Sequence, residues 1–247
     1  MLREKAAAAG FGKDNGFRWR GTDVSRVEGF SDNVFGFALT LLVVSLEVPK
    51  TFTDLEETFR GFIAFALAFA LLFSIWFYHY KYFRRYGLED ATVIWLNALL
   101  LFVMLFFVYP LKFLFSFLVK LFSGQSTLVH LPDGTTVPSI LPEQWQTLMI
   151  AYGVGLITIY AILGVLHIHA LRKGEELQLS PRERLLTKAA VAGHFANCAI
   201  AFLSILIISI GGLPFVIFSG MTYALIGPVQ AVVGTIYRRR LRALPAE

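Results

Sequence analysis

Four stretches of this chain contain no Asp, Glu, Lys or Arg and are long enough to cross a lipid bilayer. They cover residues 61–80, 91–111, 144–171 and 189–237. A transmembrane helix needs about 20 mostly apolar residues. The last stretch is too long for one span, and Gly211-Gly212-Leu213-Pro214 interrupts it, since Gly and Pro break helices. The sequence therefore predicts five clear membrane spans.

The composition excludes the other common classes of protein. Only 16% of the residues are charged, against about 25% in a soluble domain, so a soluble globule would lack a charged surface. Disordered chains are poor in aromatic residues, which make up 15% of this chain, and Cys198 is the only cysteine, which excludes a disulfide scaffold. The net charge of +5 is interpreted as a signal of membrane topology rather than of nucleic-acid binding.

A sixth, more polar span is predicted over residues 25–48. Ser25 and Glu28 have the spacing of a capping box, and a helix of this length extends about 36 Å. Because Asp32 is costly in lipid, this helix should face protein or water. The predicted fold is an all-α integral membrane protein with six transmembrane helices in each subunit. The predicted helices lie at about 25–48, 58–81, 91–118, 144–171, 186–210 and 214–237.

The basic residues predict the orientation in the membrane. With six spans, 18 of the 22 Lys and Arg residues lie on one side, so the positive-inside rule places both termini in the cytoplasm. The predicted location is the cell (plasma) membrane, as a multi-pass protein. Residues 1–24 are predicted to be a mobile basic segment, and residues 238–247 a basic tail that contacts lipid headgroups. On the other side, Val129 and Val137 flank an Asp-Gly pair, which favours either a small hairpin or an irregular loop.

Motifs for catalysis and cofactor binding are missing. The sequence has no phosphate-binding glycine loop, no nucleophile elbow and no Thr-Val-Gly-Tyr-Gly filter. His167 and His169 would point about 200° apart on a helix and cannot share a metal. We therefore predict no enzyme activity, no cofactor and no tightly bound metal. The absence of a central Asp or Glu in any span counts against a secondary transporter.

The segment from Arg26 to Asp32 stands out at the head of the first span. These two residues lie about 120° apart on a helix and are not expected to pair with each other. An Asp in a membrane helix needs a partner, so we expect Asp32 to meet groups of a neighbouring helix. The alternative is an Asp at the interface that is hydrated by the cytoplasm.

An apolar stripe follows along the same span. It comprises Phe37, Leu41, Val44 and Val48, and Thr40 borders it at about 60° from Phe37. Asp32 points about 140° away from Phe37 and so off the stripe. Pattern alone leaves two alternatives, because the stripe packs either against helices of its own subunit or around a pore.

The motif Arg26-x-x-x-Phe30-Ser31-Asp32 resembles the opening of the transmembrane protein 175 family, in its prokaryotic branch of potassium channels. The resemblance continues with Trp76-Phe77-Tyr78-His79 in the second span, and with Asn97 and Pro110 in the third. It covers residues 25 to about 112, and the later spans agree in number and hydrophobicity.

The resemblance implies a homotetramer in which four copies of the first helix line a central pore without a carbonyl filter. Phe37 would form the constriction, where the family usually has Ile or Leu, and Thr40 would form a polar ring that aids potassium preference through transient contact with K⁺. Leu41 and Val44 would add apolar rings. Arg26, Ser31 and Asp32, with Trp76 and His79, would form a hydrogen-bonded network that joins the first two spans, and Phe30 and Asn97 would belong to the same structural network.

The predicted function is that of a passive potassium-selective cation channel. Its partners would be potassium ions, membrane lipids and further copies of the chain, without nucleic acid. The alternatives are a secondary transporter or a proton-leak pathway in the same membrane fold.

Overall fold

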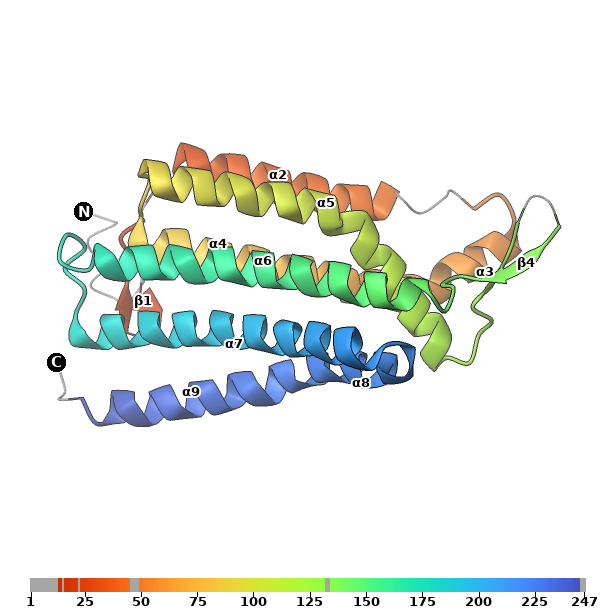
Figure 1. Cartoon of the computed structure of the whole chain (residues 1–247). Coiled ribbons are helices and arrows are strands. Elements are labelled where there is room, and N and C mark those ends of the chain that lie inside the picture. The colour runs from red at the N-terminus through yellow and green to blue at the C-terminus, as the bar shows by residue number, and fades with distance from the viewer. Residues whose placement is uncertain (1–12, 15, 22, 45–48, 132–133, 245–247) are drawn as a thin grey trace.

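The computed structural model describes residues 13–14, 16–21, 23–44, 49–131 and 134–244. Long helices dominate it, and they run side by side along one direction (Figure 1). The longer helices are α2 (Arg26–Val44), α4 (Phe62–Tyr86), α5 (Ala91–Phe122), α6 (Gln144–Arg172), α7 (Pro181–Gly211) and α9 (Ile226–Arg242). The short elements are β1 (Lys13–Asp14), β2 (Phe17–Arg18), α3 (Phe52–Arg60), β3 (Leu128–His130), β4 (Thr136–Pro138), η1 (Leu213–Phe215), α8 (Val216–Met221) and η2 (Thr222–Leu225).

Five of the described helical segments are long and apolar enough to cross a membrane. They are α4, α5, α6, α7 and the composite segment Leu213–Arg242, which joins η1, α8, η2 and α9. Helix α2 packs beside α4 and α5. Its described part has 19 residues, which corresponds to about 28 Å, and residues 45–48 of the predicted span lie outside the described residues.

Several helix ends differ from the predicted ones. The predicted helix 58–81 is divided between α3 and α4 at Gly61, and α4 continues to Tyr86, where Gly87 ends it in a left-handed conformation. Helix α7 begins at Pro181 instead of 186, because Ser180 and Glu183 form a capping box. The predicted helix 214–237 is interrupted by η2 and extends to Arg242.

The basic connections share one end of the bundle. Figure 1 shows the β1–β2 hairpin, the α4–α5 and α6–α7 connections and the last turns of α9 at that end, with α3 and the β3–β4 hairpin at the other. In that second hairpin Val129 pairs with Val137 in antiparallel register, so the structure contains the hairpin that the sequence left open.

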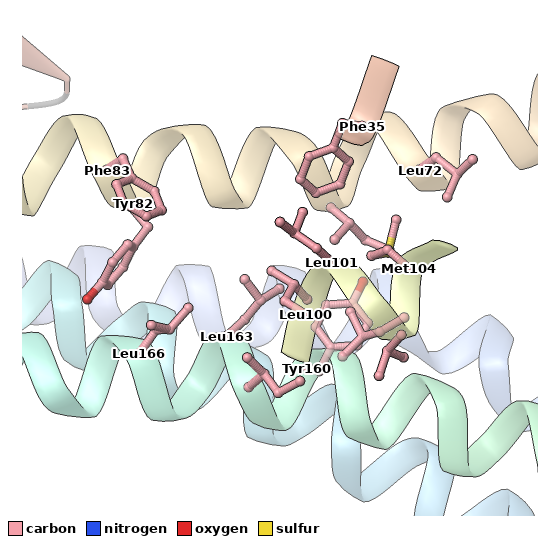
Figure 2. Close-up of a cluster of buried hydrophobic side chains, with 14 of the residues drawn as sticks. Phe35, Leu72, Tyr82, Phe83, Leu100, Leu101, Met104, Tyr160, Leu163 and Leu166 are labelled. Atoms are coloured by element: carbon pink, nitrogen blue, oxygen red, sulfur yellow. The ribbon is translucent and has the colours of Figure 1, made fainter. Parts of the chain in front are cut away.

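Helix α2 belongs to the hydrophobic core through one side only. In the cluster of Figure 2, Phe35 of α2 joins Leu72 of α4, Leu100 of α5 and Leu163 of α6. Helix α5 bends near Pro110 (Figure 1), because proline lacks the N–H that an unbroken helix needs. The hydroxyl of Tyr152 on α6 donates to the carbonyl of Pro110, which ties α6 to the bend.

Candidate functional site

Helix α2 has one face that is buried inside its own subunit. Its members recur every three or four residues, as on one side of a helix: Glu28, Ser31, Phe35, Ala38 and Leu42. Each is at most 4% exposed. This face packs against α4 and α5, so it fixes the rotation of α2 about its own axis.

The opposite face of α2 is exposed and carries most of the predicted pore residues. At 100° per residue, Asn33 lies about 180° from the centre of the buried face, Thr40 and Val44 about 160°, and Phe37 about 140°. Phe37 is 69% exposed, and Asn33 and Thr40 are exposed as well. The Thr40 hydroxyl donates a 2.9 Å hydrogen bond to the Gly36 carbonyl. In a membrane protein, an aromatic ring exposed to this extent contacts lipid or another subunit.

The predicted stripe does not lie evenly on this exposed face. Leu41 lies about 100° from the buried centre and is half-buried, packed against the core cluster. The side chain of Val44 and the whole of Val48 lie outside the described residues. Among the predicted pore residues whose side chains are described, Phe37 and Thr40 are the ones directed away from the subunit's own packing.

Asp32 meets a neighbouring helix, as the sequence predicts. The indole Nε1 of Trp76 on α4 donates a 2.8 Å hydrogen bond to its carboxylate. Asp32 is also exposed, so it combines both alternatives considered from the sequence. Two other members of the predicted network, Arg26 and Phe30, are exposed, and the Phe30 side chain is 64% exposed.

A buried polar chain links α2, α5 and α4. Asn97 donates from Nδ2 to the Ser31 hydroxyl at 2.8 Å, and Ser31 donates to the Val27 carbonyl at 2.7 Å. The Asn97 amide oxygen accepts from His79 Nε2 at 2.9 Å. His79 and Ser31 are 0% exposed and Asn97 is 2% exposed. Because buried polar groups need partners, this chain specifies how α2 sits against α4 and α5.

The first turn of α2 is held by an ion pair that no motif in the sequence indicates. Glu28 is buried and its carboxylate lies 3.5 Å from Nε of Arg84, at the end of α4. The Ser25 hydroxyl accepts a 3.1 Å hydrogen bond from the Glu28 backbone N–H, which caps the helix. Glu28 and Arg84 lie 56 positions apart in the sequence, so this ion pair becomes evident only from the packing of α2 against α4.

Residues 17–21 form an N-terminal clasp on the same end of the bundle. Phe17 is 0% exposed, and its ring meets the edge of Tyr86 at a centroid distance of 5.4 Å. The Arg85 guanidinium lies 4.9 Å from the Phe17 ring centroid, within cation–π range. This part of the predicted mobile segment is therefore packed on the bundle, because the Phe17 ring contacts Tyr86 and Arg85.

The clasp is completed by Arg20 and Gly21. Arg20 forms an ion pair with Glu183 of α7 at 2.6 Å, and the backbone N–H groups of Arg20 and Gly21 donate to the Arg84 carbonyl at 3.1 and 3.2 Å. A Cβ at Gly21 would lie 2.5 Å from the Phe83 carbonyl oxygen, so the close approach requires glycine. The clasp ties α4 to α7 a few residues before α2 begins.

Histidines do not assemble a metal site in the described residues, where no group of three or more His, Cys, Asp or Glu side chains has suitable geometry. His167 instead lies beside His194, with the two rings tilted and 5.0 Å between their centroids, and both are buried. His169 lies 2.8 Å from the carboxylate of Asp90, the N-cap residue of α5.

The match to known proteins covers nearly the whole chain. The family described as "Endosomal/lysosomal potassium channel TMEM175" matches residues 26–108. A protein of Marivirga tractuosa named "Potassium channel" is 36% identical over 236 residues, covering 94% of this chain and 95% of that protein.

Two solved structures have a related fold. A variant of the potassium channel MtTMEM175, solved in complex with a Nanobody-MBP fusion protein, superposes with a TM-score of 0.80 at 35% identity, over 92% of this chain and 99% of that one. A lysosomal potassium-selective channel TMEM175 homolog from Chamaesiphon minutus gives a TM-score of 0.53 at 19% identity, over 84% and 96% of the two chains, and that likeness concerns the fold alone. Together with its membrane-spanning helices, these matches show that the chain is a multi-pass membrane protein of the TMEM175 potassium channel family.

Proposed function

We propose that four copies of this chain surround a central pore lined by α2, through which potassium flows passively across the cell membrane. The observation that carries the proposal is the division of α2 into two faces. One face is fixed by Phe35, Ser31 and Asn97 inside the subunit. The other presents Phe37 and Thr40 outward, where both are exposed and the described part of their own subunit does not bury them. A fourfold axis next to this face gives each exposed residue three symmetry-related neighbours.

In this arrangement Phe37 forms the constriction. Four phenyl rings at one level make an apolar neck, and apolar constrictions control ion flow by excluding water. Val44 lies about 10 Å further along the helix axis and would form a second apolar ring. Leu41 is turned partly into the core, so it would contribute to the pore wall between the Phe37 and Val44 rings.

Thr40 would supply the polar ring beside the neck. Its hydroxyl proton is directed to the Gly36 carbonyl, which leaves the oxygen lone pairs available to a cation. Four hydroxyl oxygens replace only part of a hydration shell, so the preference for potassium over sodium should be modest. Potassium gains from this because it sheds water at lower cost than sodium.

The orientation follows from the basic end of the bundle. The N-terminal clasp, the two basic connections and the last turns of α9 lie together (Figure 1), and the positive-inside rule places such an end in the cytoplasm. Arg239 and Arg240 in the last turn of α9 would contact anionic headgroups there. No cofactor enters this function, and potassium ions and lipids are the small partners.

The proposal is tested by recording from purified protein in planar bilayers, with potassium on one side and sodium on the other. We expect discrete channel currents with a reversal potential displaced toward potassium equilibrium. Phe37→Ala should raise the conductance, whereas Phe202→Ala, which removes an exposed phenyl ring from α7, should leave it unchanged. The mass of the detergent-solubilised protein should correspond to four chains.

Other results would contradict the proposal. A Phe37→Ala channel with wild-type currents would mean that α2 does not line the pathway. Flux that saturates with substrate and depends on a coupled ion would indicate a secondary transporter. Current that follows the proton gradient alone would indicate a proton leak.

A further inference from the structure

We propose that Asn33 forms a second polar ring in the pore, on the other side of Phe37 from Thr40, and binds potassium through its amide oxygens. This inference rests on the proposed function, because it requires α2 to line the pore. It names a potassium contact that neither the apolar stripe nor the first-span motif includes.

The position of Asn33 on α2 is the first argument. It lies about 180° from the centre of the buried face, so it points more directly away from the subunit than Thr40 or Phe37. Asn33 is four positions before Phe37, which places its ring about 6 Å from the constriction along the helix axis, toward the end where α2 begins. Thr40 lies about 4.5 Å beyond Phe37 in the other direction.

The second argument is that the Asn33 side chain has no hydrogen-bond partner among the described residues of its own subunit. Its neighbours in sequence are both held: Ser31 bonds with Asn97, and Asp32 accepts from Trp76. Asn33 is exposed, and among the described residues its carboxamide makes no hydrogen bond. A carboxamide facing lipid would lose its partners at substantial cost, so this side chain must face water, an ion or another subunit.

The chemistry of the amide suits a cation. The Asn side chain offers a carbonyl oxygen with two lone pairs, and carbonyl oxygens are the ligands by which potassium pores replace water. Four such oxygens at one level would hold a partly hydrated ion at the entrance of the Phe37 neck. Polar rings on both sides of an apolar neck shorten the distance that an ion crosses without ligands.

The test is a charge substitution at this position. Asn33→Asp places four carboxylates around the axis, and such a ring concentrates cations in a confined path. Recorded at low salt and pH 8.5, so that the added carboxylates ionise, its potassium conductance should rise by about twofold or more. Magnesium added on the side of the N-terminal clasp should block this variant and leave the wild type unaffected. Asn33→Leu, which lacks the oxygen, should reduce the conductance by about the same factor.

A matched control separates local from global charge. Gln146→Glu makes the same amide-to-carboxylate change at an exposed position of α6 and adds the same charge to each subunit. It should behave as the wild type in both conductance and magnesium block. An equal rise in conductance for Gln146→Glu would overturn the assignment of Asn33.

The failure of this inference can be told from the failure of the proposed function. If Asn33→Asp and Asn33→Leu both conduct as the wild type while Phe37→Ala raises conductance, α2 lines the pore but Asn33 does not face it. If Asn33→Leu dissociates the tetramer while Asn33→Asp has wild-type conductance, the amide joins subunits, and the ion contact is wrong. If Phe37→Ala also has no effect, the pore assignment of α2 itself fails.

Discussion

The indole Nε1 of Trp76 donates a 2.8 Å hydrogen bond to the carboxylate of Asp32, and this contact joins α4 to α2 directly beside the exposed face of α2. It works with the Ser31–Asn97–His79 chain, which holds the buried face of the same turn. Neighbouring residues of one motif thus have separate partners. The Ser31 contact fixes how closely α2 packs on its neighbours. The Asp32 contact limits the rotation of α2 about its own axis, and so the direction in which Phe37 points.

Trp76→Phe should destabilise the subunit by removing the donor to Asp32. Hydrogen bonds to charged groups contribute about 1.5–3 kcal/mol, and because Asp32 is exposed we expect a loss of about 1.5 kcal/mol in the free energy of unfolding. Thermal denaturation in detergent measures it. Trp95→Phe is the control, since Trp95 is 76% exposed on α5 and its loss should change little.

Asp32→Asn distinguishes the charge from the hydrogen bond. The amide oxygen of Asn still accepts from Trp76, so its cost should be smaller than that of Trp76→Phe. An Asn variant that loses its tetramer while Trp76→Phe retains it would show that the carboxylate has a partner in another subunit. Equal stability of all three proteins would contradict the structural role of this contact.

Arg20→Ala should destabilise the protein strongly for a segment so near the N-terminus. The side chains of Arg20 and Glu183 are 12% and 5% exposed, and breaking a buried ion pair costs about 3 kcal/mol. Combining Arg20→Ala with Glu183→Ala should cost less than the sum of the two changes, because each leaves the other charge unpaired. Arg18→Ala is the control, as the Arg18 side chain is exposed and its backbone N–H still donates to Glu183.

The carboxylate of Asp90 predicts how stability depends on acid. Burial alone would raise the pKa of Asp90, but hydrogen bonds from His169 and from the Val93 backbone, with Lys173 nearby, lower it to about 2. An unfolded Asp has a pKa near 3.9. The stabilisation is therefore fully present above about pH 4 and is lost as the pH falls toward 2.

Asp90→Asn isolates this effect, because Asn also caps a helix N-terminus well. The difference in thermal stability between the wild type and Asp90→Asn should be largest near pH 5 and should shrink steadily between pH 4 and pH 2. A difference that stays constant over this range would mean that the ionised carboxylate does not stabilise the fold.

The sequence was sufficient for the interiors of the uncharged helices and for the expectation that Asp32 meets a neighbouring helix. Absence of charge locates the interior of a membrane helix, as in α5 and α6, since burial in lipid acts on each residue independently. It does not locate helix ends, because helices continue into the aqueous layer. Helix α7 begins at Pro181, in a segment whose arginines are typical of a connection between membrane spans.

Contacts between distant segments could not be predicted in this way. Phe17 lies in a basic stretch with no periodicity, and its burial depends on Tyr86, 69 positions later. Glu28 and Glu183 look like solvated acids until Arg84 and Arg20 are placed beside them. Asn33 does not belong to the apolar stripe in the sequence. Its place on the exposed face of α2 follows only once the buried residues of the opposite face are known.

Thr40→Ala should lower the potassium-to-sodium permeability ratio by removing the ring of hydroxyl oxygens. The hydroxyl donates to Gly36 within the same helix, so its loss should leave folding and the tetramer intact, at a cost below about 1 kcal/mol. Bi-ionic reversal potentials in planar bilayers measure the ratio. Thr40→Ser keeps the oxygen and should retain most of the wild-type ratio. If alanine and serine gave the same ratio, the loss would come from the methyl group and the shape of the neck, and the hydroxyl would have no role in selecting potassium.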